Sequence, residues 1–143
     1  MTPKKLVIYL CIFATLVLLS MFIFNPLIKL GKYDTRYIYA TEAYGYSMLP
    51  NIHSGDLLIV AKKDSPYFNP EPYDVLVYIY NDNIAVAHRL IKVQGDYYIC
   101  KGDNNPYCEV VSKDRVIGEV VEVIPSDNII AIALAKYFIS QNN

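Results

Sequence analysis

The serine at position 47 lies in the stretch YGYSMLP, and its hydroxyl is the first candidate for chemistry. A serine hydroxyl becomes a good nucleophile only when a neighbouring base removes its proton. The chain contains two histidines, His53 and His88, that could act as this base. Either histidine can therefore activate Ser47 only if it lies beside the serine in the fold.

The surroundings of the two histidines differ. His53 lies in the polar stretch NIHSGD before a turn, where a loop histidine needs no functional explanation. His88 lies in IAVAHRLI, where the alternation of a strand places Ile84, Val86 and His88 on one face. An imidazole beside aliphatic side chains is partly desolvated, which favours the neutral form that a base requires. His88 is thus the better candidate of the two, although taken alone it fits a core histidine satisfied by the backbone better than a catalytic base.

Two acidic side chains follow His88 in the stretch KGDNNPYCE. Asp103 and Glu109 are separated from His88 by one predicted hairpin, which could fold either of them back towards the imidazole. A carboxylate in that position can orient the ring and stabilise its charged form. Ordinary turn chemistry explains the same residues equally well. The spacing leaves the choice between the two acids open.

Residues 6–24 carry no charge and lie between Lys5 and Lys29. As a helix this segment is long enough to cross the hydrocarbon core of a bilayer. A removable signal peptide is the alternative, but its apolar region would be unusually long, and no small-x-small site precedes Pro26. We predict a retained transmembrane anchor. Basic residues flank both ends, so charge alone gives no orientation.

The chain after residue 38 has the composition of a β-rich domain, with Tyr, Val and Ile runs broken by Gly, Pro, Asn and Asp. Hairpin turns are predicted at 81–83 and 94–96, because their residues tolerate left-handed backbone. We therefore expect a mainly β fold, an antiparallel β domain behind an N-terminal transmembrane helix. The predicted strands are 38–44, 56–62, 74–80, 84–93, 97–101 and 116–124.

Two further segments have alternative interpretations. The loop 65–73 contains three prolines and displays aromatic rings, which either reach a lipid interface or cover the core of the domain. The apolar tail 128–139 is too short to span a bilayer, so it is either a core helix or an interfacial helix. Cys100 and Cys108 are expected to be free thiols, with a disulfide between them in an oxidising compartment as the alternative.

The charge balance argues against one class of partner. The chain has 13 basic and 14 acidic side chains, which leaves almost no net charge. Binding to nucleic acid through its phosphates requires an excess of positive charge. We therefore expect no nucleic-acid partner.

The blocks described above together resemble type I signal peptidases, specifically the endoplasmic-reticulum and archaeal branch. The matching blocks follow the order of that family, from the N-terminal anchor to about residue 124, as GYSMLP (45–50), GDLLIV (55–60), HR (88–89), KGDNN (101–105) and VIG (116–118). Bacterial-type enzymes have a lysine where this chain has His88. The same clan contains self-cleaving repressors and mutagenesis proteins, but these are soluble and use a lysine base.

The resemblance implies a membrane-bound serine endopeptidase that removes signal peptides, with Ser47 as nucleophile and His88 as general base. Members of the branch generally have an aspartate where this chain has Glu109. The third catalytic residue is therefore either Glu109 or Asp103, with Asp114 a more distant choice. By this reading the chain divides into a tail (1–5), an anchor (6–24), a linker (25–37), a catalytic β domain (38–127) and a C-terminal helical tail (128–143).

The same resemblance implies how the substrate would bind. A signal peptide would lie extended as an added strand, in contact with Tyr44, Gly45, Ile84 and Val86. No metal or organic cofactor is implied. Membrane lipid, a translocon and accessory subunits are the other expected partners, and the domain would lie on the extracytoplasmic or luminal side.

Two other functions remain open from the sequence. A membrane-anchored self-cleaving regulator would cut its own chain. A catalytically idle subunit that only binds signal peptides would hold Ser47 and His88 too far apart for a hydrogen bond.

Overall fold

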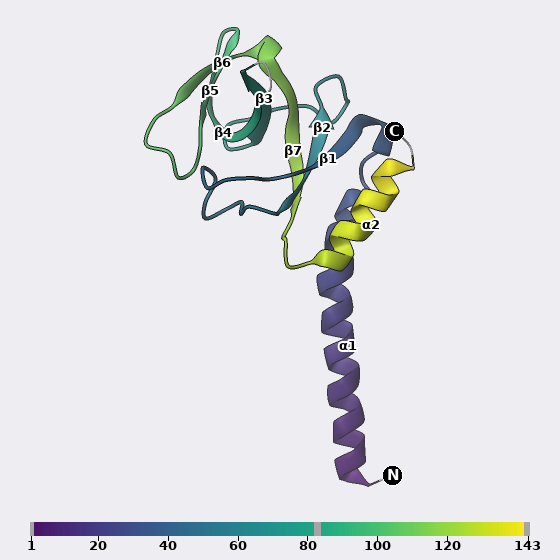
Figure 1. Ribbon diagram of the computed structural model, residues 1–143. Coiled ribbons are helices and arrows are strands. Elements are labelled where there is room, and N and C mark those ends of the chain that lie inside the picture. Colours follow the sequence, from purple (N-terminus) through teal and green to yellow (C-terminus); the bar gives the residue numbers. More distant parts are fainter. Residues whose placement is uncertain (1, 82–83, 142–143) are drawn as a thin grey trace.

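A long N-terminal helix projects from a β domain in the computed structural model, which describes residues 2–81 and 84–141 (Figure 1). This helix, α1 (Pro3–Leu30), is long and apolar enough to cross a membrane, and its most apolar stretch is entirely unburied. It continues three residues before and six after the predicted anchor 6–24. A second helix, α2 (Ile129–Ser140), follows the domain.

The described residues form one antiparallel sheet of seven strands in the order β1-β2-β7-β3-β4-β5-β6. The strands are β1 (Ile38–Glu42), β2 (Leu57–Lys62), β3 (Val75–Asn81), β4 (Ile84–Gln94), β5 (Tyr97–Lys101), β6 (Glu109–Ser112) and β7 (Val116–Ile124). Short 3-10 turns, η1 (Thr35–Tyr37) and η2 (Lys113–Arg115), precede β1 and β7. The predicted fold class, mainly β with an N-terminal apolar helix, is confirmed.

The six predicted strands agree with the structure to within two residues at each end, but β6 was missed. It has four residues, pairs with β5 alone among the described strands, and follows a run of Gly, Asn and Pro that is typical of a loop. The turn between β4 and β5 forms at Gly95, whose φ of 58° is in the left-handed region. The other predicted turn, 81–83, includes residues 82–83, which lie outside the described part of the chain.

The proline-rich loop lies partly against the domain itself. The hydroxyl of Tyr67 accepts a hydrogen bond from the Asp34 amide at 2.9 Å, and its ring meets the ring of Tyr33 edge-on. Phe68 packs against an apolar cluster whose residues come from β3, β4, β5, β6 and β7. Only Tyr73 is exposed among the three aromatic residues of this loop. Two of its rings therefore cover the protein's own surface.

The helix α2 packs beside the C-terminal end of α1, and one residue joins them (Figure 1). Pro26 has no N–H, so it cannot donate the usual helical bond to the carbonyl of Phe22. The side-chain amide of Asn128 donates to this carbonyl instead, at 3.0 Å. The oxygen of the same amide accepts from the Ala131 N–H at 3.2 Å, which caps α2. Asn128 thus completes the hydrogen bonding of both helices.

A cluster of apolar side chains lies where the two helices meet the sheet. It consists of Leu30, Ile38, Leu57, Ile59, Ile124, Ala131, Ala135 and Ile139. These residues come from α1, β1, β2, β7 and α2, so the cluster holds the helix pair against the edge of the sheet. One face of the tail helix is therefore part of the core.

Candidate active site

Buried neighbours hold Ser47 in the loop between β1 and β2. Met48 and Ile52 are each 5% exposed and insert into the core cluster under this loop. The Met48 carbonyl accepts from the amides of Asn51 and Ile52, both at 3.0 Å, which closes a tight turn. Ser47 therefore lies where the chain passes from the exposed Tyr46 to the buried Met48.

The turn that follows β5 supports the same loop from the other side. The Asn104 amide donates to the Ser47 carbonyl at 2.8 Å, and the Asn104 side chain donates to the Tyr46 carbonyl at 3.2 Å. A Cβ at Gly102 would lie only 2.8 Å from the Ser47 carbonyl oxygen, so the close approach requires glycine. The KGDNN block thus positions the backbone of the serine.

His88 reaches the serine from the sheet. It lies on β4 opposite Leu76 of β3 and is 5% exposed. Its Nε2 atom lies 3.1 Å from Oγ of Ser47, within the distance at which an imidazole can accept a hydroxyl proton. The other histidine, His53, contacts Asp56 within its own loop.

Two groups face the other nitrogen of His88. The hydroxyl of Tyr78 lies 2.9 Å from Nδ1, and Oε2 of Glu109 lies 3.3 Å from it. The Tyr78 hydroxyl also donates to the Glu109 carboxylate. When Nε2 accepts from Ser47, Nδ1 must carry the proton of the neutral ring and can donate it towards these two oxygens. The four side chains then form one continuous hydrogen-bonded chain.

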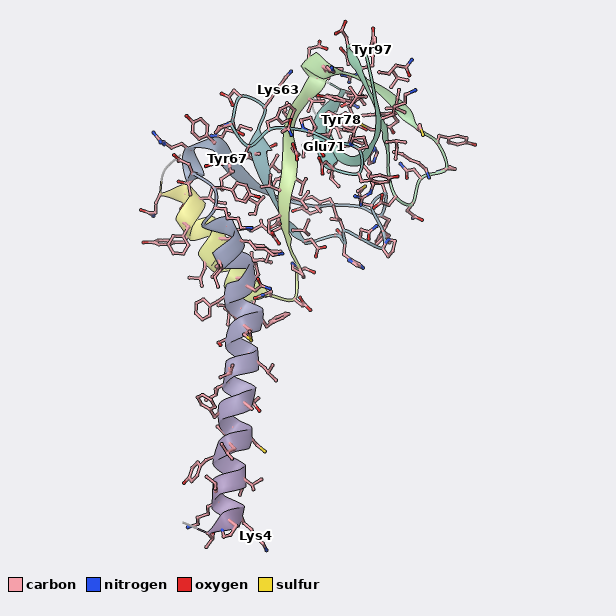
Figure 2. The ribbon with its side chains drawn as sticks, turned by 180° about the vertical axis from the view of Figure 1, so that it is seen from behind. Lys4, Lys63, Tyr67, Glu71, Tyr78 and Tyr97 are labelled. Carbon is pink, nitrogen blue, oxygen red and sulfur yellow. The ribbon has the colours of Figure 1, made fainter. Side chains whose placement is uncertain are left out.

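Tyr78 is the member of this group that the sequence analysis missed. Burial, with the hydrogen bond to Glu109, raises the pKa of Tyr78 well above its ordinary value, so the phenol keeps its proton. Figure 2 shows Tyr78 within the sheet, in contrast to Tyr97 at the outer end of the domain. Its alternation with Leu76 on β3 was visible in the sequence, but its position beside His88 depends on the pairing of β3 with β4.

Glu109 and Asp103 occupy different positions. Glu109 begins β6 and pairs with Cys100, which in turn lies opposite Leu90, two residues after His88. This row across three strands brings the glutamate to the imidazole.

Asp103 instead binds Arg89 through two hydrogen bonds of 2.7 and 2.6 Å, and it accepts from Asn51 at 2.8 Å. The bond to Arg89 holds the pKa of Asp103 below its usual value. The third acid considered, Asp114, is bonded to Ser112. Of the three candidate acids, the structure places Glu109 at His88 and the other two elsewhere.

A groove of about 480 Å³ opens beside Ser47. The four residues predicted to contact substrate, Tyr44, Gly45, Ile84 and Val86, all line it. Gly45 has a φ of 93°, which an L-residue rarely adopts, and open space lies where its Cβ would be. The other walls are mostly apolar, with Ala43, Met48, Ile52, Leu58, Val77, Ala85, Ala87 and Ile117 among them.

Metal-ligating side chains do not gather in the described residues: no group of three or more His, Cys, Asp or Glu is placed to hold an ion. Cys11, Cys100 and Cys108 are free thiols. The side chains that meet beside the groove are those of Ser47, His88, Tyr78 and Glu109.

A serine hydroxyl on a histidine whose second nitrogen faces a carboxylate is the arrangement of a serine hydrolase. Residues 21–121 match the family described as Peptidase S24-like, and the chain belongs to that family. The matched region contains all four side chains of the hydrogen-bonded chain, and the family supports a serine peptidase. No curated protein matches this sequence.

Proposed function

We propose that this protein is a membrane-bound serine endopeptidase that removes N-terminal signal peptides from exported precursors. The observation that carries the proposal is the 3.1 Å approach of Ser47 Oγ to His88 Nε2 at the edge of an open groove. The long apolar helix α1 and the histidine at the position of the base are further support.

In the proposed mechanism, Ser47 attacks the scissile carbonyl while Nε2 of His88 takes its proton. The imidazolium that forms donates from Nδ1 towards Tyr78 and Glu109, which stabilise its charge. His88 then gives the Nε2 proton to the leaving amine, and water releases the acyl group from Ser47. The Ser47 amide is the proposed donor to the developing oxyanion.

Tyr78 and Glu109 share the role of the third residue in this proposal. Glu109 is one methylene longer than the aspartate of related enzymes, and its carboxylate lies 3.3 Å from Nδ1. The Tyr78 hydroxyl is closer, at 2.9 Å, and donates its own proton to the glutamate. The phenol therefore hydrogen-bonds to the carboxylate and to the imidazole at once, and in this way it holds the ring in place.

The substrate would bind as an extended strand along the groove. Its opposite walls come from residues 43–45 and 84–87, whose backbones could pair with a peptide between them. Small side chains at the first and third positions before the cut are expected from the family resemblance. The apolar lining of the groove is consistent with small apolar side chains.

Membrane attachment fits this substrate. Signal peptides reside in the bilayer, so a peptidase tethered by α1 meets them at a raised effective concentration. By resemblance, the catalytic domain lies on the extracytoplasmic or luminal side, near a translocon or accessory subunits. The partners in this proposal are therefore signal peptides and membrane lipid.

A second candidate is a membrane-anchored regulator that cuts its own chain. The observation that favours it is the Peptidase S24-like match, because self-cleaving repressors belong to the same clan. The histidine at position 88 argues for the signal peptidase, since the self-cleaving relatives use lysine. An idle binding subunit has least support, because Ser47 and His88 lie within hydrogen-bonding distance.

The test is cleavage of a purified precursor by the full-length protein in liposomes. Ser47→Ala and His88→Ala should each lower kcat by at least about 10³-fold. The matched controls are Ser54→Ala and His53→Ala, because both side chains are exposed in the same loop and should leave the rate unchanged. Equal cleavage by wild type and Ser47→Ala would refute the peptidase.

The same experiment separates the two candidate functions. A tagged Ser47→Ala chain is added as a possible substrate beside the precursor, and the new N-termini are sequenced. If the precursor is cleaved while the wild-type protein and the tagged Ser47→Ala protein both stay intact, signal-peptide removal is supported. Cleavage confined to the protein's own chain supports the self-cleaving regulator.

A further inference from the structure

One face of α2 is apolar and uncovered. Ile129, Ile130, Tyr137 and Phe138 are each more than half exposed, whereas Ala131, Ala135 and Ile139 on the other face are buried in the core cluster. The buried residues recur every four positions, and Ile130 and Phe138 form an adjacent row with the half-buried Leu134. The helix therefore has two apolar sides, of which the sheet and α1 cover one.

The charge of α2 is unusual for a helix that faces water. Lys136 is its only charged side chain, and it forms an ion pair with Glu42 of β1. The exposed side thus has no acidic group to oppose a membrane surface. An apolar patch of this kind on a domain surface marks a site that contacts lipid or protein.

The contact between Asn128 and α1 sets the depth of this face. Asn128 donates to the Phe22 carbonyl, and Phe22 lies within the uncharged segment 6–24. From Lys5 to Phe22 the helix rises about 26 Å, close to the hydrocarbon thickness of about 30 Å. If the charge of Lys5 lies at one surface, the first residues of α2 lie near the other edge of the hydrocarbon.

The direction of α2 places its aromatic residues farther out. From its start beside Phe22 the helix runs along the last part of α1 towards the sheet (Figure 1). Phe138 is therefore about 12 Å farther along the helix than Ile130. Aromatic rings are favoured at the level of the headgroups, where Tyr137 and Phe138 would lie. The exposed Asp127 at the start of α2 indicates a boundary position, because a carboxylate requires water.

We propose that the exposed face of α2 begins at the headgroup–acyl boundary and extends outward through the headgroup layer, so that α1 and α2 together hold the catalytic domain at a set height above the bilayer. This inference rests on the proposed membrane anchoring by α1. The occupant is lipid because the face continues the unburied surface of α1, to which Asn128 joins it.

Tryptophan reporters test the proposal directly, because the chain contains no tryptophan. Full-length Ile130→Trp and Phe138→Trp are reconstituted in liposomes with lipids brominated at different acyl depths. Phe13→Trp, in the middle of α1, is the positive control, and Tyr107→Trp, on an exposed loop of the sheet domain, is the negative control. Precursor cleavage by each variant shows that it is folded.

The expected result is a graded loss of emission. Phe13→Trp should be quenched most by bromine deep in the bilayer, Ile130→Trp by bromine near the headgroups, and Phe138→Trp only by the shallowest label. Tyr107→Trp should be unaffected by brominated lipid and quenched by acrylamide from the water.

Two results would overturn the proposal while leaving α1 in the membrane. Quenching of Ile130→Trp and Phe138→Trp by acrylamide alone would show that α2 faces water. Protection from both quenchers would show that a second copy of the chain covers the face. If Phe13→Trp is also unquenched, α1 does not enter lipid, and the membrane part of the proposed function fails together with this inference.

Discussion

The hydroxyl of Tyr78 lies closer to Nδ1 of His88, at 2.9 Å, than the carboxylate of Glu109 does at 3.3 Å. The phenol donates to that carboxylate and, with its raised pKa, stays protonated at neutral pH. Nδ1 of His88 therefore faces two oxygen atoms, and the phenol joins its own oxygen to the carboxylate by a hydrogen bond.

Removal of this hydroxyl should slow catalysis without weakening substrate binding. Tyr78→Phe keeps the ring but loses one hydrogen bond to His88, which we expect to lower kcat about ten-fold. KM should stay the same, because Tyr78 does not line the groove. Steady-state kinetics with a signal-peptide substrate measures both values. A changed KM with an unchanged kcat would show that Tyr78 has no part in positioning His88.

Substitution of the two acids near the site should affect different properties: activity for Glu109 and stability for Asp103. Glu109→Gln removes the charge that stabilises the imidazolium, so kcat should fall by about 10²-fold or more while the thermal unfolding midpoint changes little. Asp103→Asn weakens the bonds to Arg89 and should lower the free energy of unfolding by about 2 kcal/mol. Asp114→Asn, away from His88, is the control. A larger kcat loss in Asp103→Asn, with its stability intact, would reverse the assignment.

The stability of the domain should depend on the ionisation of Glu119. Burial raises the pKa of Glu119 from 4.5 to about 7 in the folded protein. A raised acid pKa favours the protonated folded state, so this contribution is complete below pH 4.5 and is lost as the pH rises through about 7.

Glu119→Gln stays neutral and can still accept from the Asn69 amide. The variant should therefore gain in unfolding midpoint over wild type as the pH rises from 4.5 to 7, and keep that gain at higher pH. Thermal unfolding in detergent across this range measures the difference. A difference that is constant with pH would contradict the prediction.

Removal of the Tyr39 hydroxyl should increase the stability of the folded protein. Within the described residues, this hydroxyl is the buried side-chain group that has no hydrogen-bond partner. Tyr39→Phe should therefore raise the free energy of unfolding by about 1 kcal/mol, the cost of a buried unpaired donor. Tyr78→Phe, which removes a paired hydroxyl, should have the opposite sign. Because Tyr39 lines the groove, a rise in KM would instead show that its hydroxyl serves the substrate.

The bond between Asn128 and Phe22 should depend on Pro26. Asn128→Asp keeps an oxygen that caps α2 but loses the donor to the Phe22 carbonyl, which should cost about 1 kcal/mol of stability. Pro26→Ala supplies a backbone N–H to the same carbonyl, so Asn128→Asp should cost less in that background. Thermal unfolding of the four proteins in detergent gives the coupling energy. Strict additivity would show that the two residues act independently.

Most of the fold was predictable because its signals are local. Runs of Tyr, Val and Ile between turn residues identified six strands, and the uncharged residues 6–24 identified the long helix. The strand β6 was not predictable, since its four residues are defined only by pairing with β5. The sequence singled out Ser47, His88 and Glu109, but it gave no reason to choose Glu109 over Asp103. That choice depends on strand register, which also brings Tyr78 to His88.

The structure also shows which contacts the residues of the KGDNN and VIG blocks make. Asp103 and Asn104 bind the loop that contains Ser47. Gly118 allows β7 to approach the Ala61 carbonyl of β2, because a Cβ at this position would lie 2.4 Å from the oxygen. These contacts join segments that are far apart in the sequence, so composition and spacing could not predict them.

The bond from Asn128 to Phe22 joins residues 106 positions apart, one near each end of the chain. The ribosome synthesises α1 well before α2, so the first helix exists long before its partner helix. The core cluster that contains Leu30 and Ile38 is closed only when Ala131, Ala135 and Ile139 arrive. Completion of the core where α1 meets the sheet therefore waits for the synthesis of α2, and a chain cut before Ile129 would lack the side chains that close this cluster.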